Sequence, residues 1–166
     1  MITQLTIGIL SGTTTGIEPI YSVAYKRRYL EGNVWKAKYC IDATAQAVID
    51  NAGIDPDKIE TARSLSYDVE RRIKFQADVQ DYVDMAISST CNLPSWGSEV
   101  NNEDTVEDFA RVLAKYAPRL RGFTCYPDGS RGGQPINEIS YKEAKSKEGV
   151  IVEENMDSCK NGICGI

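Results

Sequence analysis

Apolar and polar positions follow strand and helix periods in several stretches of the chain. Residues 5–10 form a short apolar run typical of a buried strand, and residues 86–93 and 120–126 are two further strand candidates. Residues 104–117 carry apolar side chains at helical spacing and are followed by Pro118, so they predict an amphipathic helix. That strand–helix–strand order is the unit that builds parallel sheets through a right-handed crossover.

A second helix is predicted over residues 67–85, with Ser66 as its N-cap. Its apolar positions recur at helical spacing along one side. Gln76 and Gln80 lie four residues apart near that side. Both glutamines are therefore either buried and hydrogen-bonded or simply exposed.

Two segments before residue 60 give different kinds of signal. Residues 42–51 predict a short helix that begins at the N-cap Asp42 and ends before Gly53. Residues 20–31 carry tyrosines at four-residue spacing, which a helix would place on one face and which a strand would also accommodate. Packing explains these tyrosines better than a base-stacking surface does. They are Tyr21, Tyr25 and Tyr29.

The composition changes at Arg131. A glycine-rich loop is followed by a charged stretch with few apolar residues, which indicates a flexible arm. We therefore expect residues 1–131 to form an α/β segment and residues 132–166 to form a tail.

Two cysteines close the tail, with the turn dipeptide Asn-Gly between them. A turn there would bring the Cα atoms of Cys159 and Cys164 to the roughly 5–6 Å that a disulfide needs. Spacing alone leaves two interpretations open. The pair is either a dithiol that carries electrons by thiol–disulfide exchange or two leftover thiols on a chain end.

Composition narrows the function classes. The net charge of −5 argues against a protein that binds a nucleic-acid backbone. No apolar run approaches the roughly 20 residues that span a membrane, and the N-terminus lacks a signal-peptide pattern. We therefore expect a cytoplasmic protein with neither membrane nor nucleic acid as a partner. In that compartment, five cysteines indicate thiols, ligands or redox groups before structural disulfides.

The chain contains no histidine. This excludes Ser-His-Asp and Cys-His catalytic machinery and any histidine-ligated metal site within the chain. Only Cys159 and Cys164 lie close together in sequence, so a four-cysteine zinc site is not expected either. Cys91 and Cys125 fall in predicted strands, where cysteine behaves as a small hydrophobic residue, and Cys40 carries no signal.

The loop at residues 11–19 combines small hydroxyl residues with two glycines. Such loops offer backbone N–H groups that suit an anion, although a plain loop at the end of a strand would look the same.

Five segments, in this order along the chain, together resemble one family. The chain looks like the C-terminal portion of a ribonucleotide reductase large chain of the adenosylcobalamin-dependent, class II kind. The similar segments are residues 11–19 with the downstream residues 25–28, residues 76–84, residues 86–94, residues 126–131, and the Cys-x₄-Cys pair at the end.

The resemblance implies an α/β fold, namely the C-terminal part of a ten-stranded α/β barrel with few parallel strands. It implies reduction of ribonucleotides to deoxyribonucleotides for DNA synthesis through a cysteine radical, with two further active-site cysteines oxidised in each turnover. Cys159 and Cys164 would re-reduce that disulfide and be recharged by thioredoxin or glutaredoxin. The loop positions near the nucleotide phosphate, and so the substrate-binding candidates, would be Thr13, Thr14, Thr15 and Gly16.

The barrel segments that carry the radical cysteine lie upstream of this region in the family. Residues 1–5 also stand where the family has a Pro-Thr-Gly-Thr-type phosphate loop. We therefore expect this chain to need an N-terminal reductase half or an intact reductase chain as a partner, with adenosylcobalamin bound mainly by that part. The alternatives are a non-catalytic remnant that acts as an interaction module, and a stand-alone dithiol carrier. The carrier is disfavoured because the cysteines are not a Cys-x-x-Cys pair at a helix N-terminus.

Overall fold

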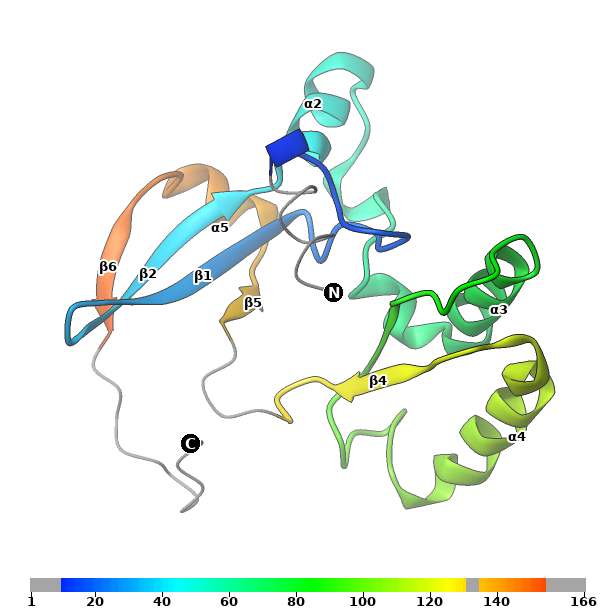
Figure 1. Cartoon of the computed structure of the whole chain (residues 1–166). Helices are drawn as coiled ribbons and strands as arrows, with labels where there is room; N and C mark the ends of the chain where they lie inside the picture. The colour runs from blue at the N-terminus through cyan, green and yellow to red at the C-terminus, as the bar shows by residue number, and fades with distance from the viewer. Residues whose placement is uncertain (1–9, 131–134, 155–166) are drawn as a thin grey trace. The chain divides into compact units, whose positions relative to one another are not determined.

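The computed structural model describes residues 10–130 and 135–154 (Figure 1). The chain divides into two compact units. Unit 1 comprises residues 1–21 and 60–130, and unit 2 comprises residues 22–59 and 131–166. Residues 22–59 thus form a compact unit with residues 135–154, a division that differs from the expected single break at residue 131.

Unit 1 contains the expected strand–helix–strand sequence. Its strands β3 and β4 pair in parallel, with Cys91 opposite Cys125, and α4 lies between them in sequence. Both strands are shorter than the hydrophobic pattern suggested. The elements of unit 1 are η2 (Ser64–Tyr67), α3 (Val69–Gln80), β3 (Thr90–Leu93), η3 (Glu103–Thr105), α4 (Val106–Tyr116), η4 (Ala117–Arg119) and β4 (Thr124–Pro127).

The core of unit 1 lies where α3 and α4 meet the parallel strands. Its buried members are Ile73, Ala77, Cys91, Leu93 and Tyr116. Two half-buried aromatic rings also pack on this cluster: Phe109 of α4 and Phe123, which directly precedes β4. The core therefore combines residues that are distant in sequence.

Helix α3 differs from its predicted bounds at both ends. Asp68, rather than Ser66, caps it, because the Asp68 carboxylate accepts a hydrogen bond of 3.2 Å from the backbone N–H of Arg71. The helix ends at Gln80 instead of continuing to residue 85. There the Gln80 side chain donates to the carbonyl oxygens of Val83 and Met85, at 2.7 and 2.9 Å, and so stabilises a turn.

Unit 2 is built on an antiparallel sheet with the strand order β5-β1-β2-β6. Its long central hairpin pairs β1 with β2 from Ala24 opposite Ile41 to Glu31 opposite Val34. The elements of unit 2 are β1 (Ala24–Glu31), β2 (Val34–Ile41), α2 (Ala43–Ala52), η1 (Pro56–Lys58), β5 (Ile136–Glu138), α5 (Tyr141–Ser146) and β6 (Ile151–Glu154).

The tyrosine-rich segment is a strand, so the extended alternative was the correct one. Pairing with β2 decides this, because a strand of eight residues gains a full hydrogen-bonded partner that local spacing does not reveal. The predicted short helix is confirmed as α2. Asp42 accepts hydrogen bonds from the N–H groups of Thr44 and Ala45, at 2.9 and 3.0 Å, and Gly53 ends the helix at φ 62°.

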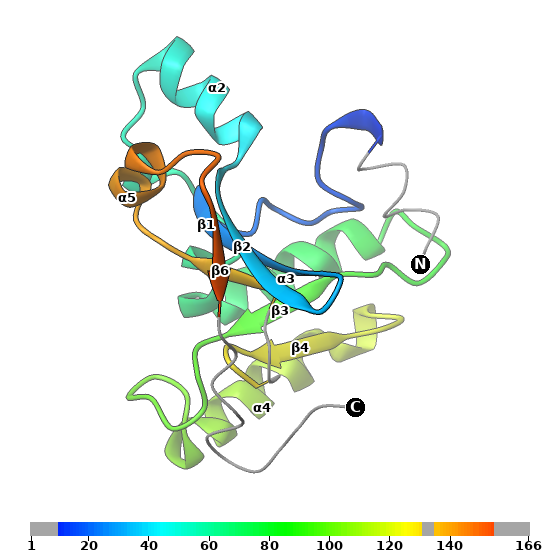
Figure 2. The ribbon, with the colours of Figure 1, turned by 90° about the vertical axis from the view of Figure 1, so that its left-hand side faces the viewer.

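The described part of the expected tail is folded. Residues 135–154 form β5, α5 and β6, and α5 covers one face of the sheet (Figure 2). Ala144 of α5 and Ala37 of β2 are both fully buried there. These short elements need few apolar residues to fold because they pack against the β1–β2 hairpin. Cys159 and Cys164 lie outside the described residues.

The chain is a mixed α/β protein, as the sequence indicated. The described residues form one sheet of four strands and one of two strands. Within those residues neither sheet closes on itself, so the ten-stranded barrel is not formed by the described part of the chain.

Candidate functional site

A carboxylate from the N-terminal loop reaches the start of β3. Glu18 accepts a hydrogen bond of 2.6 Å from the backbone N–H of Thr90 through one oxygen. Its other oxygen accepts a hydrogen bond of 2.9 Å from the Arg72 guanidinium of α3. Arg72 also donates to the hydroxyl of Ser89, so Glu18, Arg72, Ser89 and Thr90 form a clamp that ties the loop to both α3 and β3.

The clamp is well shielded from solvent. The side chain of Arg72 is 6% exposed and that of Glu18 is 25% exposed. Removing one partner of such a pair would leave a charge without compensation in a poorly hydrated place. Within unit 1 the clamp therefore holds the loop in place.

Arg72 begins a polar stripe on the buried side of α3. Gln76 and Gln80 follow at intervals of four residues, and all three side chains are buried. Gln76 donates a hydrogen bond of 2.9 Å to the carbonyl of Gly122, just before β4. The glutamines are thus buried and hydrogen-bonded, the first of the two alternatives that the sequence left open. The stripe positions the segments that enter both parallel strands.

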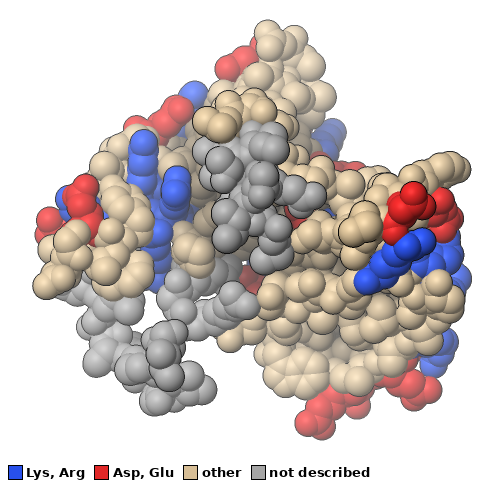
Figure 3. Space-filling model, in the orientation of Figure 1, with Lys and Arg blue, Asp and Glu red and all other residues tan. Residues whose placement is uncertain are grey.

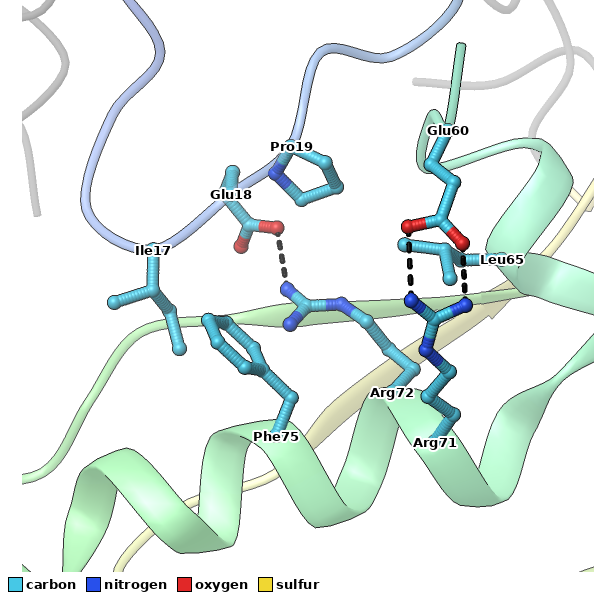
Figure 4. A pocket seen from close by; sticks show the side chains of 8 residues that line it. All are labelled: Ile17, Glu18, Pro19, Glu60, Leu65, Arg71, Arg72 and Phe75. Atoms are coloured by element: carbon cyan, nitrogen blue, oxygen red, sulfur yellow. Dashed lines mark hydrogen bonds and ion pairs between the residues drawn. The ribbon is translucent and has the colours of Figure 1, made fainter. Parts of the chain in front are cut away.

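A pocket of about 320 Å³ opens beside the clamp (Figure 4). Apolar side chains and two arginine–glutamate pairs line it. Figure 4 shows the Phe75 ring beside the Arg72 guanidinium, whose carbon lies 5.7 Å from the ring centroid. The lining residues are Ile17, Glu18, Pro19, Glu60, Leu65, Arg71, Arg72 and Phe75.

Both cations of this pocket already have carboxylate partners. Arg71 bonds Glu60 through both of its terminal nitrogens, one of them at 2.9 Å, and Arg72 bonds Glu18. An entering anion would therefore compete with a carboxylate at each guanidinium. The pocket suits a small, largely apolar group better than a free phosphate.

The predicted substrate-binding residues lie immediately before the clamp, and they do not line this pocket. Thr13 and Thr14 are exposed, and the carbonyl of Thr15 accepts a hydrogen bond of 3.1 Å from the N–H of Glu18. Gly16 has a φ of 59°, a conformation that favours glycine. This turn directs Glu18 toward β3. The phosphate-binding role of residues 13–16 stays a prediction.

The turn after β4 is joined to its surroundings at the carboxyl ends of the parallel strands. The Asp128 N–H donates a hydrogen bond of 3.0 Å to the carbonyl of Leu93, the last residue of β3. The Asp128 carboxylate forms an ion pair of 3.0 Å with Arg63. Ligands of parallel α/β sheets bind beyond this end of the strands, so the turn faces the region where substrate chemistry is usually placed.

Cys91 is a core residue, as its position in a strand predicted. Its side chain is 2% exposed, and burial raises the pKa of the Cys91 thiol to about 12. Burial also raises the pKa of the half-buried Cys125 thiol, its neighbour on β4. Both residues are free thiols, and at neutral pH neither supplies the thiolate that exchange chemistry requires.

Across residues 10–130 and 135–154, no three acidic or cysteine side chains gather closely enough to ligate a metal ion. None of the helices in those ranges has the length and apolar character of a membrane span. The predicted redox pair Cys159 and Cys164 lies outside these ranges, so its geometry is not described.

Sequence reasoning did not single out the clamp residues. Glu18 lies within the loop whose glycines and threonines drew attention, and Arg72 lies one residue before core residue Ile73. A usable signal was present, because Arg72, Gln76 and Gln80 repeat at four-residue spacing along the buried side of a helix. A buried polar stripe of this kind requires partners.

Comparison with known proteins connects these features to a family. A family model described as the barrel domain of ribonucleotide reductase matches residues 4–126. That range contains the loop, the clamp, the polar stripe, the whole of β3 and all of β4 except its last residue, Pro127. No solved structure matches the chain.

Two curated relatives extend this result. A vitamin B12-dependent ribonucleoside-diphosphate reductase of Mycobacterium tuberculosis (strain CDC 1551 / Oshkosh) is 26% identical over 156 residues, covering 82% of this chain and 22% of the relative. A protein of the same name from Thermoplasma acidophilum is 24% identical over 168 residues, covering 89% of this chain and 21% of the relative. The chain thus spans about one fifth of the length of these relatives. With most of its residues matched by the family model, the chain belongs to the ribonucleotide reductase barrel-domain family.

Proposed function

We propose that this chain serves as the C-terminal part of a ribonucleotide reductase, as a fragment or split subunit that completes a catalytic α/β barrel. The observation that carries the proposal is the two-stranded parallel sheet of unit 1. Parallel strands occur almost only in larger sheets that are covered on both faces. Among the described residues of unit 1, β3 and β4 pair only with each other, so each has one open edge.

Apolar exposure in unit 1 supports the same conclusion. Tyr82 is 92% exposed, Met85 is 77% exposed and Trp96 is 57% exposed. They flank β3 in sequence, with two before it and one after it. Large apolar side chains left exposed before and after an open strand support a cover by another part of a protein. We assign that cover to the rest of a reductase barrel.

The terminal cysteine pair supplies the proposed redox role. In the proposal Cys159 and Cys164 exchange with the disulfide that each turnover leaves in the active site, returning it to two thiols and becoming a disulfide themselves. Lys160 lies next to Cys159 in sequence, and a neighbouring cation favours the thiolate. Thioredoxin or glutaredoxin then reduces the pair. Buried Cys91 and half-buried Cys125, with raised thiol pKa values, are poor candidates for this exchange.

The substrate in this proposal is a ribonucleotide, held beyond the carboxyl ends of the barrel strands. The loop at residues 13–16 would contribute backbone N–H groups near its phosphates. The cofactor would be adenosylcobalamin, which generates the radical when bound. The pocket beside the clamp, of about 320 Å³, is smaller than this corrinoid. It does not fit the cofactor, so we assign cofactor binding mainly to the rest of the barrel.

Reconstitution tests the proposal. A vitamin B12-dependent reductase truncated where its similarity to this chain begins would be mixed with the chain, adenosylcobalamin, ribonucleotide and reductant. The expected result is deoxyribonucleotide formation that requires both polypeptides. An inactive mixture, beside an active intact reductase, would support the alternative of a non-catalytic interaction module.

A matched variant tests the redox pair in the same mixture. Cys159→Ser should abolish turnover supported by thioredoxin and largely retain turnover supported by a small dithiol, which reaches the active site by itself. Ser158→Ala, which alters the residue beside Cys159 and keeps both thiols, serves as the control and should leave both rates unchanged. Equal loss with both reductants would refute the shuttle role.

A further inference from the structure

One face of the unit 2 sheet has no covering element in the described part of that unit. Directly paired residues of antiparallel strands share a face. Ala37 and Tyr39 lie on the face that α5 covers, and both are buried. The opposite face, here called the open face, is defined by Tyr25, Arg27 and Tyr29 of β1 and by Lys36, Lys38 and Cys40 of β2.

Cations occupy the centre of the open face. Arg27 and Lys38 are direct partners across β1 and β2, and both are exposed. Neither forms an ion pair with any described residue, whereas Lys36 pairs with Glu31 at the hairpin end. Figure 3 shows Lys and Arg side chains gathered over this sheet. In a chain of net charge −5, this concentration of positive charge is local.

The margins of the open face add apolar and acidic groups. Ile151 of β6 is opposite Lys38 and 51% exposed, and Val34 at the start of β2 is 42% exposed. Glu153 and Glu138 stand at the two outer strands. Exposed aliphatic and half-buried aromatic groups around Arg27 and Lys38 resemble the composition of a protein interface with an acidic partner.

The open face is also close to the cysteine pair along the chain. Strand β6 ends at Glu154, opposite Trp35, and Cys159 follows five residues later. A chain extends at most about 3.6 Å per residue, so Cys159 lies within about 18 Å of the end of β6. The cations Lys36 and Lys38 lie one and three residues from Trp35 on the same strand. A protein seated on the open face would therefore have the pair within reach.

We propose that the open face is the docking site for an acidic dithiol protein that reduces the Cys159–Cys164 disulfide. The inference rests on the redox role proposed above. One thiolate of the docked protein attacks a sulfur of the pair and forms a mixed disulfide, and its second thiol resolves that bond. The pair gains two electrons and two protons, and the partner's dithiol becomes a disulfide. Charge attraction raises the rate of encounter.

The test measures reduction of the oxidised chain, which does not need the rest of the barrel. The probe is an acidic thioredoxin at low salt, with the state of Cys159 and Cys164 followed by alkylation and peptide mapping. The variant Arg27→Glu with Lys38→Glu should lower the second-order rate about tenfold, and added salt should shrink that difference. Reduction by dithiothreitol should be unchanged.

A second pair of substitutions provides the charge-matched control. Lys58→Glu with Lys142→Glu alters the same net charge in the same unit, at exposed positions on η1 and α5. This variant should keep the rate of the unaltered chain. Equal thioredoxin rates for all three proteins would overturn the docking proposal and leave the redox role intact.

Two further outcomes separate the proposals. If the unaltered chain forms no Cys159–Cys164 disulfide, or thioredoxin does not reduce it, the redox role fails and the docking proposal fails with it. If a single-stranded oligonucleotide binds the open face in a manner that Arg27→Glu with Lys38→Glu abolishes, while the thioredoxin rate is unchanged, the face belongs to nucleic acid instead.

Discussion

The two units of this chain bury their sheets in different ways. In unit 2 the central strands are joined by a hairpin, each has a neighbour on both sides, and α5 seals one face with small residues such as Ala144 and Ala37. In unit 1 two parallel strands are joined through α4, and their surroundings include a buried arginine and two buried glutamines. Both central strands of unit 2 are thus paired on two sides, whereas each parallel strand of unit 1 is paired on one side only within the described residues.

Each unit is therefore vulnerable at a different place. In an antiparallel sheet the central hairpin tolerates the loss of one cap or contact, because its two strands remain paired with each other. A two-stranded parallel sheet has little hydrogen bonding of its own. Unit 1 therefore relies on the clamp of Glu18, Arg72, Ser89 and Thr90 to hold its loop and first strand together.

The two tryptophans allow the units to be observed separately. Trp35 lies in β2 of unit 2, and Trp96 follows β3 in unit 1. Trp35→Phe leaves a fluorescence reporter for unit 1, and Trp96→Phe leaves one for unit 2. Urea unfolding of these two backgrounds measures each unit's stability, and the following substitutions are made in both.

The largest effect is expected for Arg72→Met. It retains much of the side-chain volume but leaves the Glu18 carboxylate and the Ser89 hydroxyl without their shared donor. Breaking a buried pair from one side costs about 3 kcal/mol. The Trp96 transition should move to lower urea while the Trp35 transition stays in place. An equal shift of both transitions would contradict the separate roles of the units.

A smaller effect, confined to unit 2, is expected for Asp42→Ala. The substitution removes the acceptor for the N–H groups of Thr44 and Ala45 at the start of α2. Loss of an N-cap costs about 1 kcal/mol. The Trp35 transition should shift by that amount, and Asp42→Asn, which keeps an acceptor oxygen, should restore most of it. An unchanged Trp35 transition in Asp42→Ala would show that α2 does not contribute to the stability of the unit.

The smallest effect is expected from pH at an exposed carboxylate of unit 1. Hydrogen bonds from Lys115 and then from the Tyr116 hydroxyl lower the pKa of Glu70. Folding thus favours the charged form of Glu70. The contribution of this carboxylate to the stability of unit 1 is present above the pKa of the carboxyl in the unfolded chain. It is lost as the pH falls through the lower pKa of the folded state. Glu70→Gln should lower unit 1 stability slightly at pH 7 and not at pH 2. A difference that persists at pH 2 would exclude this ionisation as its cause.

Local chemistry made part of the fold predictable. The cap at Asp42, the stop at Gly53 and the amphipathic pattern of α4 act within a few residues, and all three were recognised. The strand at residues 24–31 was ambiguous because its tyrosine spacing fits a helix, and only pairing with β2 decides between them. Residues 135–154 have too few apolar side chains to predict a fold, yet they fold on a hairpin that lies about 100 residues earlier.

The site was harder to predict because its residues are distant from one another in sequence. Glu18 and Arg72 are 54 residues apart in sequence, and nothing local to either residue indicates the other. The cysteine pair was found from spacing and resemblance, and it remains a prediction. The family, in contrast, followed from five motifs in order along the chain, and the family model matches residues 4–126.

Hydrogen exchange tests most directly whether unit 1 needs the rest of a reductase barrel. Deuterium uptake would be compared for the chain alone and for the chain mixed with a vitamin B12-dependent reductase truncated where the similarity begins. We expect slower uptake in peptides covering β3 and β4, whose outer amides gain partners, and unchanged uptake in the β1–β2 hairpin. Equal uptake in β3 and β4 with and without the truncated reductase would contradict this expectation.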